Sequence, residues 1–321
     1  MKFGLLQFFS WTRRVPLETV YQRALERIQI MDQTGYDAVW LAEHHFNTYS
    51  VCPSTTLMGM NVAARTKRLR IGTAVTLAGL YHPLRLAEEL ALLDQMSGGR
   101  LNWGAGRGYD ATEFRAFGVQ PEDSAERLRE CVEIVLQAFG DGRVNYRGRH
   151  WQIEDVEVLP KPVQRPHAPV WLAATSQESV LRAAEAGFSI LMDPHSTHAE
   201  IGRKHALYRE TLARHGHVYA GREIPIARMV AVAPSDAAAE DAARAGAQWT
   251  IGYAKIPGAP DDEQAAIDRY VNEVMIHGSP ERMVDEIQSL RERIGLESLM
   301  IAPLSHESFV LFTERVLPKL G

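Results

Sequence analysis

The order of apolar segments along the chain limits its fold most strongly. Short runs of β-branched, aromatic and other apolar residues alternate from end to end with longer segments of helical period. This alternation is typical of repeated βα units, which build parallel sheets covered by helices. The segments that we expect to be strands are residues 2–8, 37–45, 69–75, 100–106, 169–175, 188–194, 224–233 and 297–303.

The segments between these runs carry helix signals. Val20, Ala24 and Ile28 recur on one helical stripe. A later helix begins with Ser279 as N-cap and Pro280 at the first helical position. Eight strands, each followed by a helix, predict an α/β fold of the (β/α)8 TIM barrel class. A doubly wound sheet is less favoured, because no GxGxxG motif opens the first βα unit.

The length leaves room for additions to a barrel. Such barrels typically need about 250 residues, and this chain has 321. We expect insertions near residues 140–157, which resemble a small hairpin, and 249–278, which are rich in Gly, Pro and Asp. No linker, repeat or low-complexity tract is visible, so we expect one domain over residues 1–321. We expect the second insertion to be a mobile lid.

Composition excludes several classes of protein. A net charge of −5 and dispersed Lys and Arg residues do not favour nucleic acid or an anionic membrane as partner. Cys52 and Cys131 lie far apart without CxxC spacing, which argues against a disulfide framework or a zinc site. No apolar run approaches the ~20 residues of a spanning helix, and the first apolar run lacks the order of a signal peptide. We expect a cytoplasmic protein.

Two adjacent histidines follow the second predicted strand. Because side chains alternate along a strand, only one of His44 and His45 should point inward. The small Ala42 on the face of His44 leaves room for a flat ligand, so we expect His44 to be inward, with Glu43 and His45 paired on the other face. Two structural histidines remain the alternative. A metal site is less favoured, because no HExxH or neighbouring ligand set accompanies them.

Anion-binding residues follow two other predicted strands. Arg107 stands among glycines after the fourth strand and offers a forked cation for a phosphate or carboxylate. Ser176 follows the fifth strand and leads into a helix, whose free N–H groups favour anions. Either residue alone has an ordinary explanation, a solvated arginine or a helix N-cap. Together they predict a two-sided phosphate clamp.

Three motifs carry a resemblance to a known family. They are EHHF at 43–46, LLDQMSGGRLNWG at 92–104 and GRGYDATEFRAFG at 106–118. Together with YHPLRLAEE, APVWLAATS and HGSPERM, they resemble the bacterial luciferase-like flavin monooxygenases over nearly the whole chain. The resemblance implies a barrel that binds FMN, which a separate NAD(P)H:flavin reductase supplies in reduced form. O2 would then form a flavin C4a-hydroperoxide that oxygenates a small apolar carbonyl or hydrocarbon substrate.

The resemblance also assigns residues. It implies that His44 is catalytic, with His45 as its neighbour in the motif. It further implies a non-proline cis peptide between Ala74 and Val75, beneath the flavin ring, and a homodimer formed through helices at 55–65 and 83–96. The residues implied in binding FMN are Ala74, Val75, Gly106, Arg107, Arg127, Ala173, Ala174, Thr175, Ser176 and Ser179.

Two positions depart from the luciferase pattern. Gly106 replaces a cysteine that faces the flavin, and Thr175 replaces a glutamate, so flavin binding is expected but light emission is not implied. The lost bulk at Gly106 is expected to widen the pocket. Two other functions stay open: hydride transfer with the deazaflavin F420, and a non-catalytic flavin-binding subunit.

Overall fold

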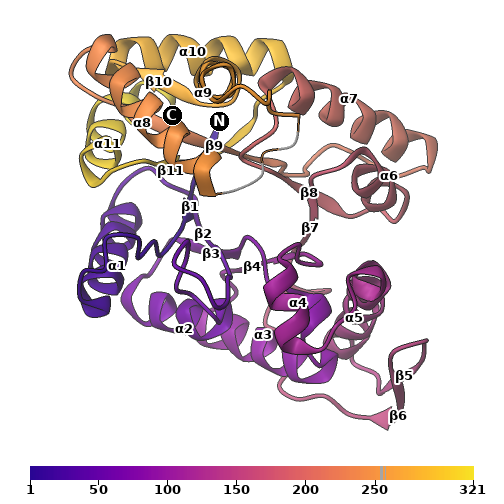
Figure 1. Cartoon of the computed structure of the whole chain (residues 1–321). Coiled ribbons are helices and arrows are strands. Elements are labelled where there is room, and N and C mark those ends of the chain that lie inside the picture. The colour runs from indigo at the N-terminus through magenta and orange to yellow at the C-terminus, as the bar shows by residue number, and fades with distance from the viewer. Residues whose placement is uncertain (254–255, 257) are drawn as a thin grey trace. The chain divides into compact units, whose positions relative to one another are not determined.

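The computed structural model describes residues 1–253, 256 and 258–321 (Figure 1). Each of the eight predicted strand segments contains a strand. These parallel strands are β1 (Lys2–Gln7), β2 (Ala38–Leu41), β3 (Arg70–Thr73), β4 (Leu101–Ala105), β7 (Val170–Ala174), β8 (Ser189–Met192), β9 (Pro225–Val232) and β11 (Ser298–Pro303). Their pairing follows the order β9-β11-β1-β2-β3-β4-β7-β8, and β9 also pairs with β8. In the described residues, this closed parallel order is that of the predicted (β/α)8 TIM barrel.

Helices connect the strands. They are α1 (Leu17–Gln33), α2 (Thr55–Arg65), α3 (Pro83–Ser97), α4 (Ala111–Phe117), α5 (Ser124–Phe139), α6 (Gln177–Glu185), α7 (His198–Arg214), α8 (Asp236–Tyr253), α9 (Glu263–Glu273), α10 (Pro280–Ile294), α11 (His306–Leu311) and α12 (Leu317–Leu320). On α1 the predicted stripe is buried. Helix α10 begins at the predicted cap, where Ser279 accepts a hydrogen bond from Arg282 N–H. None of the described helices has the length and apolarity needed to cross a membrane.

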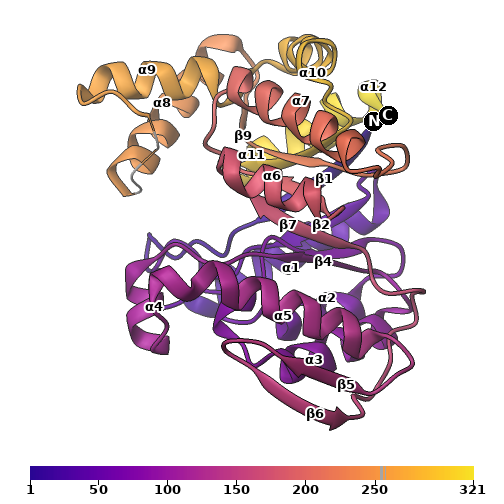
Figure 2. The same ribbon diagram turned by 90° about the vertical axis from the view of Figure 1, so that its right-hand side faces the viewer.

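The chain folds into two compact units. Unit 1 contains residues 1–5, 34–37 and 174–321, and unit 2 contains residues 6–33 and 38–173. Helices α1 to α5 belong to unit 2, and α6 to α12 belong to unit 1 (Figures 1 and 2).

Aromatic rings pack the core of each unit. In unit 2 the Trp40 and Trp171 rings meet edge to face at 5.2 Å, and a Cβ added to Gly72 would lie 2.2 Å from Trp40. Glycine is therefore required there, because no side chain fits beside the indole. In unit 1, Phe3 packs edge to face on Phe312 at 6.1 Å.

The second strand is shorter than predicted. The sequence predicted a strand over residues 37–45, whereas β2 ends at Leu41. Ala42 N–H still bonds to Gln7 O at 3.2 Å, but His44 N–H bonds to Cys52 O at 3.2 Å, within its own loop. The chain has therefore left the sheet before the two histidines, and strand alternation cannot assign their directions.

The insertion near 140–157 contains an antiparallel pair of strands. β5 (Val144–Arg147) pairs with β6 (Gln152–Val156) beside α5 (Figure 2). The buried Glu130 carboxylate of α5 holds the turn, because it accepts hydrogen bonds from Arg149 N–H at 2.7 Å and Trp151 N–H at 3.1 Å.

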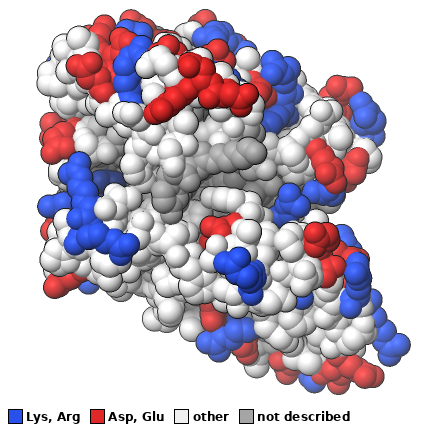
Figure 3. All heavy atoms as spheres, in the orientation of Figure 1, with Lys and Arg blue, Asp and Glu red and all other residues white. Residues whose placement is uncertain are grey.

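The insertion near 249–278 contains the end of α8, helix α9 and strand β10 (Ile276–Gly278). Ala254, Lys255 and Pro257, in the middle of the predicted lid, lie outside the described residues. The lid therefore stays a prediction. On the face in Figure 3, acidic and basic side chains are interspersed.

Candidate functional site

The EHHF motif forms a polar cluster in unit 2. His44 and His45 are half-buried. Glu43, which follows the end of β2, is only 2% exposed. Glu43 Oε1 lies 3.2 Å from His45 Nε2, which confirms the predicted pair. His45 is therefore anchored by a buried carboxylate.

Glu43 also accepts hydrogen bonds from two side chains on neighbouring elements. Its carboxylate accepts hydrogen bonds from Thr55 Oγ1 at 3.3 Å and Tyr81 Oη at 3.1 Å. Burial raises the pKa of Glu43, although the donors His45 and Tyr81 partly oppose the shift. Burial, followed by the Glu43 charge, raises the pKa of Cys52 to about 12. This thiol is therefore not a reactive nucleophile.

Aromatic rings surround His44 on the loops that follow the unit 2 strands. Its ring lies 6.4 Å from that of Phe8 after β1, 5.2 Å from Tyr49 and 6.2 Å from Tyr109 after β4. His44 Nδ1 lies 3.7 Å from Glu113 Oε1, and Nε2 has no hydrogen-bond partner among the described residues. An imidazole with one nitrogen near a carboxylate and the other free can take up and release a proton.

Sequence reasoning missed Glu113. It stands three residues after Asp110, the N-cap of α4, so the pattern suggests a capping glutamate. In the structure, Asp110 caps Thr112 N–H at 2.7 Å, while Glu113 instead accepts the backbone N–H of His45 at 2.9 Å. A partner 68 residues away leaves no local signal. Across the described part of the chain, no group of three His, Cys, Asp or Glu side chains is placed to hold a metal ion.

The wall after β3 contains the predicted cis peptide. The bond between Ala74 and Val75 is cis and does not involve proline, as expected. The expectation that Gly106 widens a pocket is wrong in one respect. A Cβ on Gly106 would lie 2.4 Å from Val75 Cγ2 and 3.5 Å from Ala173 Cβ. The room that glycine leaves is therefore filled by Val75.

The two predicted arginines of unit 2 differ. Arg107 is exposed, and its guanidinium has no hydrogen bond or ion pair with any residue that the structure describes. Arg127 is half-buried, donates from Nε to Gly79 O at 2.8 Å and lies 5.3 Å over the Trp151 ring. Arg107 is therefore available to an anion, whereas Arg127 already supports the loop after β3.

The predicted residues of unit 1 lie at the end of β7 and just after it. Ser176 is the N-cap of α6 and forms a capping box with Ser179, each side chain accepting the other's backbone N–H at 3.2 and 3.0 Å. Thr175 is exposed, and Ala174 is buried at the end of β7. Arg107 belongs to unit 2 and Ser176 to unit 1, so the predicted clamp stays a prediction.

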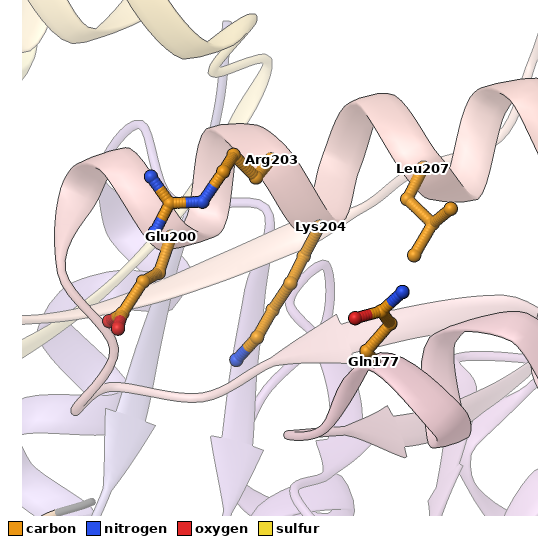
Figure 4. Close-up of a pocket in the computed structure, with 5 residues that line it drawn as sticks. All are labelled: Gln177, Glu200, Arg203, Lys204 and Leu207. Carbon is orange, nitrogen blue, oxygen red and sulfur yellow. The ribbon is translucent and has the colours of Figure 1, made fainter. Parts of the chain in front are cut away.

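A lysine that sequence reasoning did not identify supports this turn. Lys204 of α7 donates from Nζ to Thr175 O at 2.6 Å and to Ser196 Oγ at 2.7 Å, and it pairs with Asp193 at 3.2 Å. Burial opposes ionisation of Asp193, but Lys204 and nearby N–H donors lower its pKa. Beside them, Gln177 and four residues of α7 line a surface hollow of about 350 Å³ (Figure 4).

Comparison with known proteins agrees with this arrangement. The family model described as luciferase-like monooxygenase matches residues 1–298. The chain is 31% identical over 217 residues to the alkanal monooxygenase alpha chain of the Kryptophanaron alfredi symbiont, covering 68% of this chain and 61% of that one. It is 32% identical over 177 residues to the oxygenase component of a flavin-dependent trigonelline monooxygenase of Acinetobacter baylyi, covering 54% and 49%. The chain spans about half the length of the first curated relatives it matches.

Solved structures share the fold over the full length. A monooxygenase, RslO1, from Streptomyces bottropensis superposes with a TM-score of 0.87 at 26% identity, covering 100% of both chains. The oxygenating constituent of 3,6-diketocamphane monooxygenase from Pseudomonas putida, in complex with FMN, gives 0.83 at 21% identity, covering 100% and 99%. An F420-dependent secondary alcohol dehydrogenase gives 0.81 at 18%, covering 100% and 99%. The last two comparisons concern the fold alone. The chain belongs to the luciferase-like monooxygenase family.

Proposed function

We propose that the chain is an FMN-dependent monooxygenase of the cytoplasm. FMN, when bound in its reduced form, would supply the two electrons that the reaction with O2 requires. One oxygen atom would enter a small apolar carbonyl or hydrocarbon substrate, and the other would leave as water. The observation that carries this proposal is the His44 imidazole, whose Nε2 has no hydrogen-bond partner among the described residues, in a chain of the luciferase-like monooxygenase family.

The residues present have the chemistry that FMN requires. Arg107 is an exposed cation that has no hydrogen bond or ion pair with the residues the structure describes, and Ser176 opens helix α6, whose first N–H groups favour a phosphate. We propose each of them as a phosphate-binding residue for FMN, Arg107 in unit 2 and Ser176 in unit 1. The other residues proposed for FMN binding are Arg127 and Ala173 in unit 2, and Ala174, Thr175 and Ser179 in unit 1.

The flavin ring needs an apolar wall. Ala74, Val75 and Gly106 offer one in unit 2, where Val75 packs against Gly106. We propose that this wall bears the ring.

His44 would handle protons at Nε2. Oxygenation requires a proton to reach the activated oxygen and to be removed again, and imidazole exchanges protons near neutral pH. The aromatic rings of Phe8, Tyr49 and Tyr109 limit the directions that the His44 ring can take. His45, held by Glu43, would support the loop instead of reacting.

A flavin reductase and a second copy of the chain are further proposed partners. The trigonelline relative is an oxygenase component, which supports a separate NAD(P)H:flavin reductase as the source of reduced FMN. Leu57 and Met96, on α2 and α3 of unit 2, are 73% and 63% exposed. Large apolar side chains at such exposure support a homodimer through these helices.

Hydride transfer with F420 is the second candidate function, since an F420-dependent dehydrogenase shares the fold. Anaerobic titration of the protein with reduced FMN and, separately, with reduced F420 distinguishes the two. We expect saturable binding of reduced FMN at micromolar concentration, and O2 uptake when oxygen is admitted. Tight binding of reduced F420 with none of FMN would overturn the proposal. A protein that binds reduced FMN without accelerating O2 uptake would be the third candidate, a non-catalytic subunit.

A further inference from the structure

Glu113 is a buried carboxylate at the start of α4 in unit 2. It is 2% exposed, and among the described residues it has no Lys or Arg partner. Its Oε1 accepts His45 N–H at 2.9 Å and lies 3.7 Å from His44 Nδ1. A carboxylate taken out of water needs donors to offset its desolvation. The backbone of one histidine and the ring of the other are the donors that face it.

The distance to His44 has a chemical consequence. At 3.7 Å the pair is slightly beyond a hydrogen bond, but the carboxylate is close enough for its charge to act on the His44 ring. A carboxylate at Nδ1 favours the tautomer with the proton on Nδ1, because the alternative directs a nitrogen lone pair at a negative charge. Within the described part of the chain, the other titratable groups that face the His44 ring are the phenols of Tyr49 and Tyr109.

We propose that Glu113 is a positioning residue that keeps the His44 proton on Nδ1 and so presents Nε2 as the proton acceptor. Glu113 acts through two contacts. Its carboxylate faces His44 Nδ1, and its hydrogen bond from His45 N–H fixes the backbone next to His44. Glu43 performs the matching task for His45. Two buried carboxylates thus fix two adjacent imidazoles in different ways. A catalytic role for the unprotonated Nε2 rests on the proposed function. The assignment of the His44 proton to Nδ1 does not depend on that function.

The tautomer is measurable without any cofactor. Nitrogen-15 NMR of the histidine rings distinguishes protonated from unprotonated ring nitrogens in alkaline buffer, where imidazole is neutral, and the spectrum of His44→Ala assigns the His44 signals. We expect the Nδ1–H form to predominate in the unaltered protein. In Glu113→Gln, which keeps an acceptor for His45 N–H but loses the charge, we expect the Nδ1–H population to fall at least twofold.

Glu130→Gln is the matched control. Glu130 is also a buried glutamate that accepts backbone N–H groups in unit 2, but the donors are Arg149, His150 and Trp151, and its carboxylate also lies 4.0 Å from the Arg129 guanidinium. The His44 tautomer should be unchanged in this variant. A predominant Nε2–H form in the unaltered protein would overturn the proposal, even if Glu113→Gln does not fold. An unchanged tautomer in a folded Glu113→Gln would also overturn it.

Kinetics then separate this inference from the proposed function. We expect Glu113→Gln to lower kcat at least tenfold with KM for reduced FMN within threefold, and Glu113→Asp to restore part of kcat. A purely structural role would instead change KM and kcat together or leave both intact, which would overturn the positioning role. If the unaltered protein neither binds reduced FMN nor consumes O2, the proposed function fails, while the NMR result still decides the role of Glu113.

Discussion

Two polar clusters in the molecule contain histidines after a strand, yet their surroundings differ. The His44 cluster of unit 2 comprises Glu43, His44, His45 and Glu113. The Arg228 cluster of unit 1 comprises Asp193, His195, His198, Arg228 and Tyr270.

In the Arg228 cluster the arginine is 1% exposed, and its Nε donates to His198 Nδ1 at 3.2 Å. His198 Nε2 in turn donates to Met275 O at 3.2 Å, and His195 Nδ1 bonds to Tyr270 Oη at 2.7 Å.

The difference lies in which histidine nitrogens stay available. Burial, followed by the Arg228 charge, lowers the pKa of His198 to about 3, so its ring stays neutral. Both of its nitrogens are engaged. The His44 side chain keeps 12% of its surface exposed, and its Nε2 has no partner in the described chain. We infer that the Arg228 cluster ties helix α9 and its neighbours to the barrel, whereas the His44 cluster performs chemistry.

The largest effect should follow from removing His44. We expect His44→Ala to lower product yield about 10²–10⁴-fold, the usual contribution of a general acid or base, and to raise peroxide leakage. Binding of FMN should stay within a few-fold. His45→Ala should chiefly lower stability, because it leaves the buried Glu43 carboxylate without its histidine partner. Product and peroxide counted per reduced FMN oxidised measure both effects, and full coupling in His44→Ala would remove His44 from the mechanism.

Acid should weaken the Arg228 cluster. The pKa of His198 in the folded protein lies below its unfolded value of about 6.5, so below that pH the unfolded chain binds a proton that the fold excludes. The free energy of unfolding should therefore fall as pH falls, by about 2 kcal/mol between pH 7.5 and pH 5. Urea unfolding at both pH values measures this. His198→Gln should flatten the dependence, and His306→Gln, an exposed control, should not; equal slopes in all three proteins would refute the assignment.

Cofactor affinity should depend on the exposed Arg107 side chain. We expect Arg107→Ala to weaken FMN binding about 10–100-fold, the loss of one charge-assisted contact of ~1.5–3 kcal/mol. Arg115→Ala, which removes an exposed arginine of α4, is the matched control and should leave the Kd unchanged. Fluorescence titration measures both. If the two variants bind FMN alike, Arg107 is a solvated surface residue.

The smallest effect concerns the wall after β3. Gly106→Ala should destabilise the fold by about 1–3 kcal/mol, because its Cβ would overlap Val75 Cγ2. Val75→Ala removes that methyl group, so the double variant should be more stable than the sum of the single changes predicts. Thermal unfolding of the four proteins completes the cycle. Strict additivity would show that the two residues do not compete for the same space.

The sequence predicted the parts that depend on local pattern. Alternation of apolar runs was enough for the eight strand positions and the barrel, and the motif resemblance gave the Ala74–Val75 cis peptide. The Glu43–His45 pair was also predicted, although the strand alternation used to assign it ends at Leu41.

Other features depend on contacts between distant segments. Glu113 reaches His45 from 68 residues away, and its position in a helix cap conceals that role. The space at Gly106 could not be predicted to be full, because the side chain that fills it belongs to the neighbouring strand end at Val75. Lys204 of α7 supports the Thr175 carbonyl from 29 residues along the chain. In each case the missing information is which segments fold together.

Oxygen labelling tests the central claim most directly. The protein would be mixed under ¹⁸O2 with reduced FMN and a panel of aldehydes, cyclic ketones and terpenes. The masses of the products would be determined by mass spectrometry. An FMN-dependent monooxygenase should add one ¹⁸O atom to each product molecule, with one reduced FMN oxidised per product, and His44→Ala should abolish most of the labelled product. Products that form without the label, or that form equally well without O2, would contradict the account.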